Sequence, residues 1–458
     1  MRAMMLSELE APLQARLTGN DAQISGVSTD SRSLSPGDLF VALSGENFDG
    51  HDYVPQLAAA GAAAVLVSRD VDTPLPQLRV VDTQQALGHL GAHNRQLYNG
   101  PLVAITGSSG KTTVKNMVQA VLSRRGRTLA TQGNFNNEIG VPLTLLRLEP
   151  GVEYAVVEMG AARAGDIAWL CELGRPSVAM LLNAMPAHLQ GFGSVDDVAA
   201  AKGEIFDGLG KGEFAIINAD QPWAEEWRAR AGAATVLDFG LERPAALGAA
   251  ETVCNGVKGV SFTAQTPVGE MRLELALPGN HNVANALAAI AVGLACELSL
   301  AEIKAGLESV KPVPGRLQSS RSPSGATVVD DCYNANPGSV RAAIDILAGC
   351  DGRRTLVLGA MKELGEDSET LHRQIGDYAR DAGIERLWGV GPELQVCIEA
   401  FGTGGCYFAD RAAALARLEG AFGPADTVLV KGSRSAGMEQ VLHALLADAA
   451  TGEVPTCC

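Results

Sequence analysis

AITGSSGKTT, at residues 104–113, is the stretch that decides how this chain folds. A short apolar run, LVAIT, leads into it from residue 102, and a helix-forming segment, VKNMVQAVLSRR, follows it. A strand, a glycine-rich turn and a helix in this order gather backbone N–H groups at the helix N-terminus, where they form an anion site. Lys111 adds a positive charge suited to outer phosphates, and the Thr112 hydroxyl suits Mg²⁺. The stretch therefore predicts a phosphate loop at the edge of a parallel sheet.

The motif is the shorter GxxGKT form, because Ile105 stands where the full motif would carry its first glycine. A GxxG turn alone is also found between an ordinary strand and helix. The appended Lys-Thr and the correct flanking elements favour nucleotide binding, and we expect Lys111 to face solvent at the start of the helix. The predicted nucleotide-binding residues of this loop are Gly107, Ser108, Ser109, Gly110, Lys111, Thr112 and Thr113.

Around the loop, short β-branched runs alternate with helical stretches. These runs are LVAIT at 102, YAVVEMG at 154, SVAMLLN at 177 and FAIIN at 214. This is the rhythm of a parallel sheet built from βαβ units. Period-two segments between residues 252 and 277 predict an antiparallel hairpin appended to that sheet, and a helix from about Asn282 to Glu297 closes the domain.

Two breaks divide the chain: YNGP at 98–101 and KPVPGR at 311–316. A length of 458 residues favours about three domains. We predict a small α/β domain at residues 1–82, a central parallel-sheet P-loop ATPase domain at 83–311 whose first part, 83–100, is a helical linker, and a Rossmann-like, doubly wound domain at 312–458. The fold class is α/β throughout.

Composition excludes several classes of protein. A net charge of −16 argues against a nucleic-acid binder, since phosphate neutralisation needs clustered Lys and Arg. We expect no signal peptide or membrane span in the first residues, because polar residues and a proline interrupt their apolar stretch. Nine scattered cysteines without a CxxC pair predict reduced thiols. We expect a cytoplasmic protein, which we take to be a monomer.

Further polar residues lie where strands of the predicted sheet end. Glu158 ends YAVVE, and His188 lies in the loop after SVAMLLN. One carboxylate is enough for a Mg²⁺ ion that also binds phosphate oxygens and water. Each of these residues also has an ordinary structural explanation when it is considered alone. Glu158 could be a surface residue, His188 could be a structural histidine, and Lys202, in the segment AAAKGEIF, could be a solvated lysine. Asn-rich turns at 133–142, 278–285 and 330–337 are poor helix or strand material, and such turns usually serve only as turns.

Taken together, these segments resemble the Mur ligase family along essentially the whole chain. The resemblance lies in segments spread from residue 28 to residue 434: STDSRSLSPGDLFVALSGENFDGHD (28–52), GSSGKTT (107–113), GNFNNEIGVP (133–142), VVEMGA (156–161), AHLQGFGS (187–194), AKGEIF (201–206), PGNHNVANALAA (278–289), PGR (314–316), DDCYNANP (330–337), LGAMKELG (358–365) and KGSR (431–434). Their order and separations match the family.

The resemblance implies a role for each candidate residue. Lys111 would stabilise the transferred phosphoryl group, Thr112 and Glu158 would hold one Mg²⁺ ion, and His188 and Lys202 would attend a second, with Lys202 carbamylated to provide a carboxylate. The remaining residues would bind the substrates. Those near the ATP would be His281, Asn282 and Asn285 at the nucleotide, Arg316 at its phosphates and Asp331 at its ribose or base. The UDP part of the UDP-sugar would face Ser28, Asp30, Ser31 and Arg32, and the other substrates would face Asn136, Asn137, Asn334 and Asn336.

The implied activity is ATP-dependent amide-bond formation through an acyl phosphate, in the synthesis of a peptidoglycan precursor that serves cell shape and division. GNFNNEIGVP and YNANP, with no DNPR-type motif, resemble the member that adds D-alanyl-D-alanine to a UDP-N-acetylmuramoyl-tripeptide. The alternative is the related ligase that adds a diamino acid to the dipeptide. A P-loop kinase or a folylpolyglutamate-type synthetase is a more distant alternative, and the STDSR…DGHD segment argues against the latter.

Overall fold

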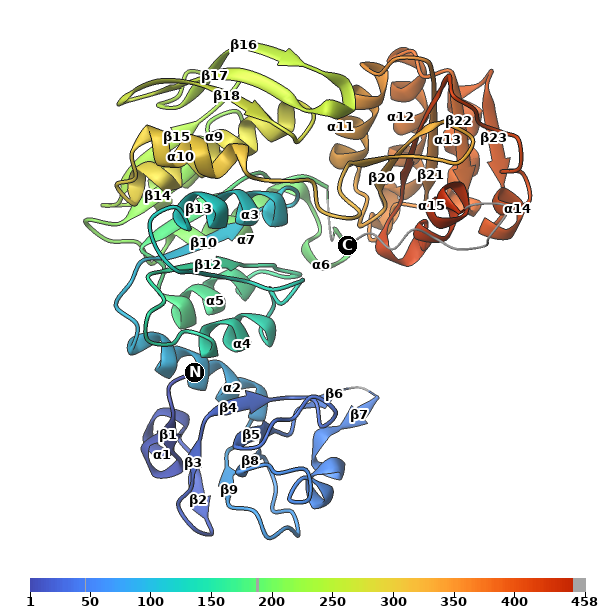
Figure 1. Cartoon of the computed structure of the whole chain (residues 1–458). Helices are drawn as coiled ribbons and strands as arrows, with labels where there is room; N and C mark the ends of the chain where they lie inside the picture. Colours follow the sequence, from blue (N-terminus) through green and yellow to red (C-terminus); the bar gives the residue numbers. More distant parts are fainter. Residues whose placement is uncertain (46, 187–188, 448–458) are drawn as a thin grey trace.

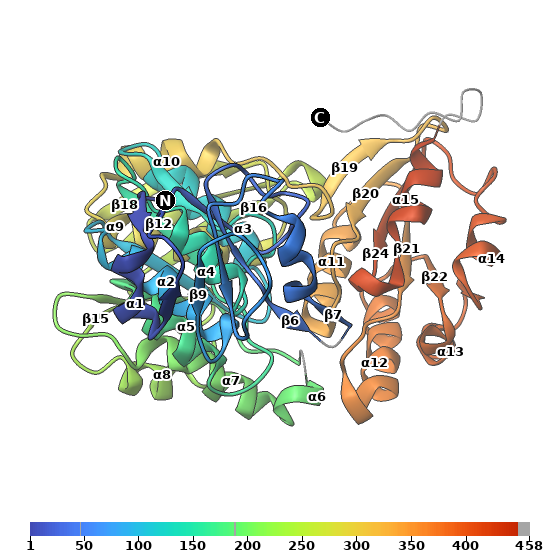
Figure 2. The ribbon, with the colours of Figure 1, turned by 90° about the horizontal axis from the view of Figure 1, so that it is seen from below.

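The computed structural model describes residues 1–45, 47–186 and 189–447. The chain forms three α/β domains that follow one another along the sequence (Figure 1). Figure 2 shows the C-terminal domain beside the other two, with α11 (Pro337–Ala348) on the side that faces them. None of the helices in these described ranges is long and apolar enough to span a membrane.

The central domain is built on a six-stranded, fully parallel sheet. Its strand order is β11-β12-β10-β13-β14-β15. The strands are β10 (Leu102–Thr106), β11 (Thr128–Ala130), β12 (Tyr154–Glu158), β13 (Val178–Leu181), β14 (Phe214–Asn218) and β15 (Thr235–Phe239). The helices around it are α3 (Lys111–Leu122), α4 (Gly140–Leu146), α5 (Asp166–Gly174), α6 (Leu189–Phe192), α7 (Val195–Gly203), α8 (Ala224–Arg230), α9 (Asn280–Ala295) and α10 (Leu300–Glu308), with a 3-10 turn at Glu204–Phe206.

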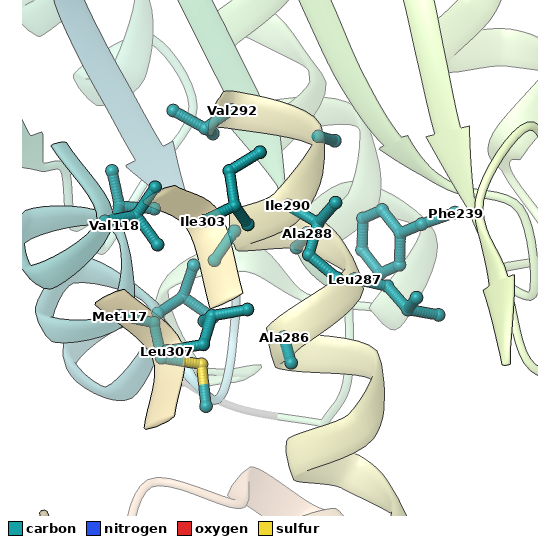
Figure 3. Close-up of a cluster of buried hydrophobic side chains, with 14 of the residues drawn as sticks. Met117, Val118, Phe239, Ala286, Leu287, Ala288, Ile290, Val292, Ile303 and Leu307 are labelled. Carbon is teal, nitrogen blue, oxygen red and sulfur yellow. The ribbon is translucent and has the colours of Figure 1, made fainter. Parts of the chain in front are cut away.

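Both faces of this sheet are buried, which explains why its strands are continuous apolar runs. Successive residues of β10 point to opposite faces. Val103 and Ile105 pack with α3, α9 and α10, whereas Leu102 and Ala104 pack with α4, α5, α7 and α8. Figure 3 shows the first of these cores, where α9 lies between Met117 and Val118 of α3 on one side and Phe239 of β15 on the other. The sheet is thereby a rigid support for the loops at its edge.

The predicted hairpin exists, but the prediction that it is appended to the central sheet was wrong. β17 (Val260–Thr266) and β18 (Gly269–Leu275) pair with β16 (Gly248–Cys254) as a separate antiparallel sheet. An isolated bridge between Phe239 and Leu247 is the link to the central sheet. Alternate residues of β17 are buried against α9, so the sheet covers a helix rather than extending the parallel sheet. A 3-10 turn, η3 (Gly256–Lys258), follows β16 and contacts α11.

The N-terminal domain has a five-stranded sheet in the order β2-β9-β8-β5-β4, in which only the β2–β9 pair is antiparallel. Its strands are β2 (Arg16–Thr18), β4 (Gly26–Ser28), β5 (Asp38–Val41), β8 (Ala64–Val67) and β9 (Gln77–Arg79). Smaller elements are α1 (Leu6–Leu13), the pairs β1 (Met4–Met5) with β3 (Gln23–Ile24) and β6 (Ser44–Gly45) with β7 (Phe48–Asp49), and a 3-10 helix at Gly50–Gln56. The predicted linker helix, α2 (Thr83–Gln96), packs on α4 and α5 of the central domain.

The C-terminal domain has a six-stranded sheet in the order β19-β20-β24-β21-β22-β23. Its strands are β19 (Gln318–Arg321), β20 (Thr327–Asp331), β21 (Arg353–Gly359), β22 (Arg386–Val390), β23 (Gly405–Phe408) and β24 (Asp426–Lys431), and only β19 is antiparallel. The helices besides α11 are α12 (Ser368–Asp381), α13 (Gln395–Phe401), α14 (Arg411–Leu415) and α15 (Glu439–Leu446), with 3-10 turns at Gly365–Asp367, Pro392–Leu394 and Arg434–Ala436. β24 lies between β20 and β21, so Lys431 stands beside Asp331 at one sheet edge.

Candidate active site

A cavity of about 410 Å³ lies where the carboxyl edge of the central sheet meets the C-terminal domain. Parallel sheets bind ligands at this edge. Most of the residues predicted from the sequence line this cavity: Ser108, Ser109, Gly110, Lys111, Thr112, Thr113, Asn136, Glu158, His281, Asn282, Asn285, Arg316, Asp331, Asn334 and Asn336. The tertiary structure thus brings segments more than 200 residues apart, such as Thr112 and Arg316, around one space.

The phosphate loop has the backbone that its glycines allow. Gly110 has a φ of +85° at the N-cap of α3, and a Cβ there would lie 2.9 Å from Asn285 Oδ1. The Nζ of Lys111 folds back and donates to the Gly107 carbonyl at 2.6 Å. The expectation of a solvent-facing Lys111 was wrong: the side chain is half-buried, and burial lowers its pKa because desolvation disfavours the charged amine. An anion entering the cavity would meet a lysine that already has reduced access to water.

Glu158 is the centre of a hydrogen-bonded cluster at the end of β12. The side chain is buried, its Oε2 accepts from Thr112 Oγ1 at 3.1 Å, and its Oε1 accepts from Asn136 Nδ2 at 2.8 Å. These groups offer a hydroxyl, a carboxylate and an amide oxygen within one cluster. Hard oxygen donors of this kind, next to a phosphate site, fit Mg²⁺. The donor set therefore agrees with the predicted cation.

Arg316 connects the C-terminal domain to the phosphate loop. Its Nη2 donates to Thr112 Oγ1 at 3.1 Å, and its guanidinium lies 4.3 Å from the centre of the Tyr333 ring. A guanidinium that stacks on an aromatic ring keeps its planar set of donors pointing in a fixed direction. Thr112 is therefore shared between a carboxylate of the central domain and a cation of the next domain.

The edge of the C-terminal sheet adds a buried ion pair to the cavity wall. Lys431 Nζ donates to Asp331 Oδ2 at 2.5 Å and to the Asn334 carbonyl at 2.9 Å. Asn334 itself is exposed, and its Oδ1 accepts from the Ala335 N–H. Asn336 has another task, because its Oδ1 accepts from the Ser339 N–H at 2.8 Å and so caps α11.

His281, Asn282 and Asn285 follow one another at the start of α9. Asn285 Nδ2 donates to Asn282 Oδ1 at 3.0 Å, and Asn282 Nδ2 donates to the Pro278 carbonyl at 2.7 Å. Burial, and secondarily the charge of Lys431, lowers the pKa of His281 to about 4. His281 is therefore a neutral imidazole near pH 7, able to donate one hydrogen bond and accept another.

Lys202 lies on α7 outside the lining of the cavity and is 2% exposed. Burial, and secondarily the positive charge of Lys111, lowers the pKa of Lys202 to about 7. The amine is 5.9 Å from the centre of the Phe192 ring. The reading of Lys202 as a solvated lysine was wrong, since this amine is buried and readily neutral. His188, its predicted neighbour, lies outside the described residues.

The residues predicted for the UDP part lie in the N-terminal domain and do not line this cavity. Ser28 Oγ donates to the Asp30 carbonyl, and Ser31 follows in a half-buried turn. Arg32 is occupied by Asp30, with Nε and Nη2 each within 2.9 Å of a carboxylate oxygen. This contact lowers the pKa of Asp30 to about 2, chiefly through the side-chain hydrogen bond.

Asn137 also lies outside the cavity lining. Its Oδ1 accepts from the Gly140 N–H at 2.9 Å at the start of α4. Among the described residues, no group of three or more His, Cys, Asp or Glu side chains has the arrangement of a metal centre. The seven cysteines of the described ranges are unpaired thiols.

The sequence reasoning missed several residues of the site. Asn183 follows β13 and holds the phosphate loop through both atoms of its amide, at 2.9 Å to the Ser109 N–H and 3.1 Å to the Ser109 carbonyl. Its place at the end of a parallel strand was a signal for it. Lys311 and Lys431 add positive charge to the cavity wall. Lys431 begins the KGSR segment, but nothing in that segment indicates that its side chain would pair with Asp331, because this contact depends on β24 pairing with β20.

The fold and this cavity define a multidomain P-loop protein of the class that binds nucleoside phosphates between domains. Family models match three consecutive parts of the chain: "Mur ligase family, catalytic domain" at residues 23–95, "Mur ligase middle domain" at 105–293 and "Mur ligase, glutamate ligase domain" at 315–434. The chain belongs to the Mur ligase family.

Proteins similar to this chain match it over nearly its whole length. The UDP-N-acetylmuramoyl-tripeptide–D-alanyl-D-alanine ligase of Escherichia coli (strain K12) is 47% identical, with 97% of this chain and 99% of that protein covered. The protein of the same name in Haemophilus influenzae is 40% identical over 96% and 97%.

Solved structures agree. A crystal structure of MurF from Acinetobacter baumannii has a TM-score of 0.93 at 35% identity, covering 97% and 99% of the two chains. MurF ligase from Thermotoga maritima in complex with ADP has a TM-score of 0.81 at 29% identity, covering 92% and 96%.

Proposed function

We propose that this chain is an ATP-dependent ligase that joins D-alanyl-D-alanine to UDP-N-acetylmuramoyl-tripeptide and so makes the pentapeptide precursor of peptidoglycan. The single observation that carries the substrate assignment is the 47% identity with a ligase of that name over 97% of the chain. The geometry of the cavity supports the ATP chemistry, because the phosphate loop, Glu158 and Arg316 converge there. The ADP complex of the Thermotoga maritima relative supports ATP as the nucleotide.

The reaction needs a leaving group on a carboxylate that is otherwise unreactive towards an amine. An oxygen of the tripeptide carboxylate attacks the γ-phosphorus of ATP, the bond to the ADP oxygen breaks, and an acyl phosphate forms. The uncharged amine of D-alanyl-D-alanine then attacks the acyl carbon, and phosphate leaves while the nitrogen loses its proton. Lys111 and Arg316 stabilise the negative charge that moves between oxygens during the first step.

We propose that one Mg²⁺ ion is held by Thr112 and Glu158, whose Oγ1 and Oε2 atoms lie 3.1 Å apart. His188 and Lys202 would hold a second ion. Bound Mg²⁺ would neutralise charge on the phosphates. We also propose a carbamate at Lys202, because only a neutral amine adds CO₂ and burial lowers the pKa of this amine to about 7, so that a large share of it is neutral at pH 7. A carbamate replaces a cation by a carboxylate, which is a ligand for Mg²⁺.

The other assignments remain proposals that follow from the family. Residues 1–82 would bind the UDP-sugar through Ser28, Asp30, Ser31 and Arg32, and residues 83–311 the nucleotide. Residues 312–458 would present the dipeptide through Asn334 and Asn336, and Asn136 and Asn137 of the central domain would also contact substrate. Arg32 would have to exchange Asp30 for phosphate oxygens on binding. A monomer in the cytoplasm, with no nucleic-acid partner, is consistent with small-molecule substrates.

Amine competition tests the function. With ATP and UDP-N-acetylmuramoyl-tripeptide, we expect phosphate release with D-alanyl-D-alanine and little with D-alanine, L-lysine or meso-diaminopimelate, because a single amino acid leaves unpaired amides in a closed site, each costing about 1–3 kcal/mol. Comparable turnover of a free diamino acid on the UDP-muramoyl-dipeptide would reassign the chain to the preceding ligase. ADP release without any amine would favour a kinase.

A further inference from the structure

Lys115 is a buried lysine that the reaction described above does not use. It lies on α3, one helical turn beyond Lys111, is 5% exposed and does not line the cavity. Its Nζ donates to the Thr131 carbonyl at 2.8 Å. A lysine is rarely buried unless it is paired, because removing an ammonium group from water is costly. A hydrogen bond to one backbone carbonyl offsets little of this desolvation cost. The burial of a lysine at this position therefore suggests a role beyond packing.

Lys115 binds Thr131, which lies just before the Asn-rich segment 133–142. Thr131 directly follows β11, and its Oγ1 accepts from the backbone N–H of Glu158 at 3.0 Å. Farther along the same segment, Asn136 contacts the Glu158 carboxylate with its amide, and its carbonyl accepts from the Gly160 N–H at 2.7 Å. Thr131 and this segment therefore form hydrogen bonds with the backbone and the side chain of Glu158, respectively.

The charge of Lys115 also acts on this cluster. Burial lowers the pKa of Lys115, and the negative charge of Glu158 opposes that shift. Lys115 lies outside the cavity that Glu158, Thr112 and Asn136 line. Lys115 therefore places a positive charge near the Glu158 carboxylate from outside the cavity that Glu158 lines.

We propose that Lys115 is a positioning residue for the cation site: it fixes the start of the segment 131–137 so that Glu158 and Asn136 present their oxygens toward the cavity. This inference rests on the proposed function, because it requires Glu158 to hold the divalent cation of the nucleotide. Residues that orient metal ligands from behind typically change metal affinity or activity by about 10- to 100-fold when they are replaced. We expect a loss of that size from Lys115.

The test is Mn²⁺ binding, measured by electron paramagnetic resonance on the full-length protein in the presence of ADP, alongside thermal unfolding. Lys115→Met keeps the length of the side chain but removes the charge and the donor, and we expect about 10-fold or weaker Mn²⁺ binding. Lys304→Met is the matched control, because Lys304 also donates to a backbone carbonyl, that of Arg272 at 2.7 Å, but its side chain is 43% exposed. The control should bind Mn²⁺ as the unmodified protein does.

Thr131→Val is the second variant, since it keeps the carbonyl that Lys115 binds but removes the acceptor for the Glu158 N–H. It should weaken Mn²⁺ binding in the same direction, and the double variant should lose less than the product of the two single losses. The inference is wrong if Lys115→Met folds, binds Mn²⁺ normally and only unfolds at a lower temperature. If Lys115→Met does not fold, the same outcome for Thr131→Val would overturn it. Absence of both Mn²⁺·ADP binding and ADP release in the unmodified protein would instead overturn the proposed function.

Discussion

Lys111→Ala will lower turnover by at least about 10²-fold while the protein remains folded. The expected loss has an electrostatic cause: Lys111 supplies a fixed positive charge where the γ-phosphoryl group gains negative charge in the transition state. The side chain is half-buried and its hydrogen bond goes to its own loop, so it contributes little to packing. Steady-state phosphate release with saturating ATP measures the effect, and circular dichroism checks the fold.

Lys211→Ala is the control for that experiment. Lys211 is an exposed lysine in the loop before β14, and it does not line the cavity. It should retain turnover, which shows that the loss at Lys111 does not come from a change of net charge. Near-normal turnover of Lys111→Ala would remove the phosphate-loop assignment.

Lys202→Ala should be nearly inactive, although Lys202 lies outside the cavity lining. The proposed carbamate supplies a carboxylate at the second cation position, and alanine leaves that position without a ligand. Because burial lowers the pKa of Lys202 to about 7, a large share of this amine is neutral at physiological pH and can add CO₂. Turnover is measured for the variant. The intact mass is measured for the protein without substitutions, in which a carbamate on Lys202 adds the mass of CO₂.

Chemical rescue separates the carbamate from a purely structural lysine. Short-chain carboxylates added in excess should restore part of the turnover of Lys202→Ala by occupying the vacated position. They should not restore Lys111→Ala, which lacks a cation rather than a carboxylate. An active, metal-loaded protein whose Lys202 carries an unmodified ammonium would rule out the carbamate.

Local pattern was enough for much of the fold. The period of the apolar residues and the glycines of the phosphate loop predicted the strand β10, the turn and the helix α3 at the right place. The prediction failed where a segment had two ways to bury the same face. The hairpin of β17 and β18 buries its alternate residues on α9, and only the presence of that helix decides this against joining the central sheet.

For the site, the sequence identified the residue types but not their partners. Glu158 was a candidate because it ends a strand, whereas Lys115, three residues beyond Thr112, looked like any polar residue of an amphipathic helix. Its hydrogen-bond partner comes from a different part of the chain, the Thr131 carbonyl directly after β11, which accepts from Lys115 Nζ at 2.8 Å. Likewise, the sequence did not reveal that the amide oxygen of Asn336 caps α11, which begins directly after it.

The sequence by itself determined the class of fold, the phosphate loop and the family resemblance, because these depend on the order and spacing of residues within short segments. The tertiary structure alone decided which side chains share a charge environment. Lys202 and His281 have lowered pKa values because folding removes water and brings Lys111 and Lys431 near them. Desolvation and Coulomb interactions depend on distance in space, and no spacing along the chain specifies that distance.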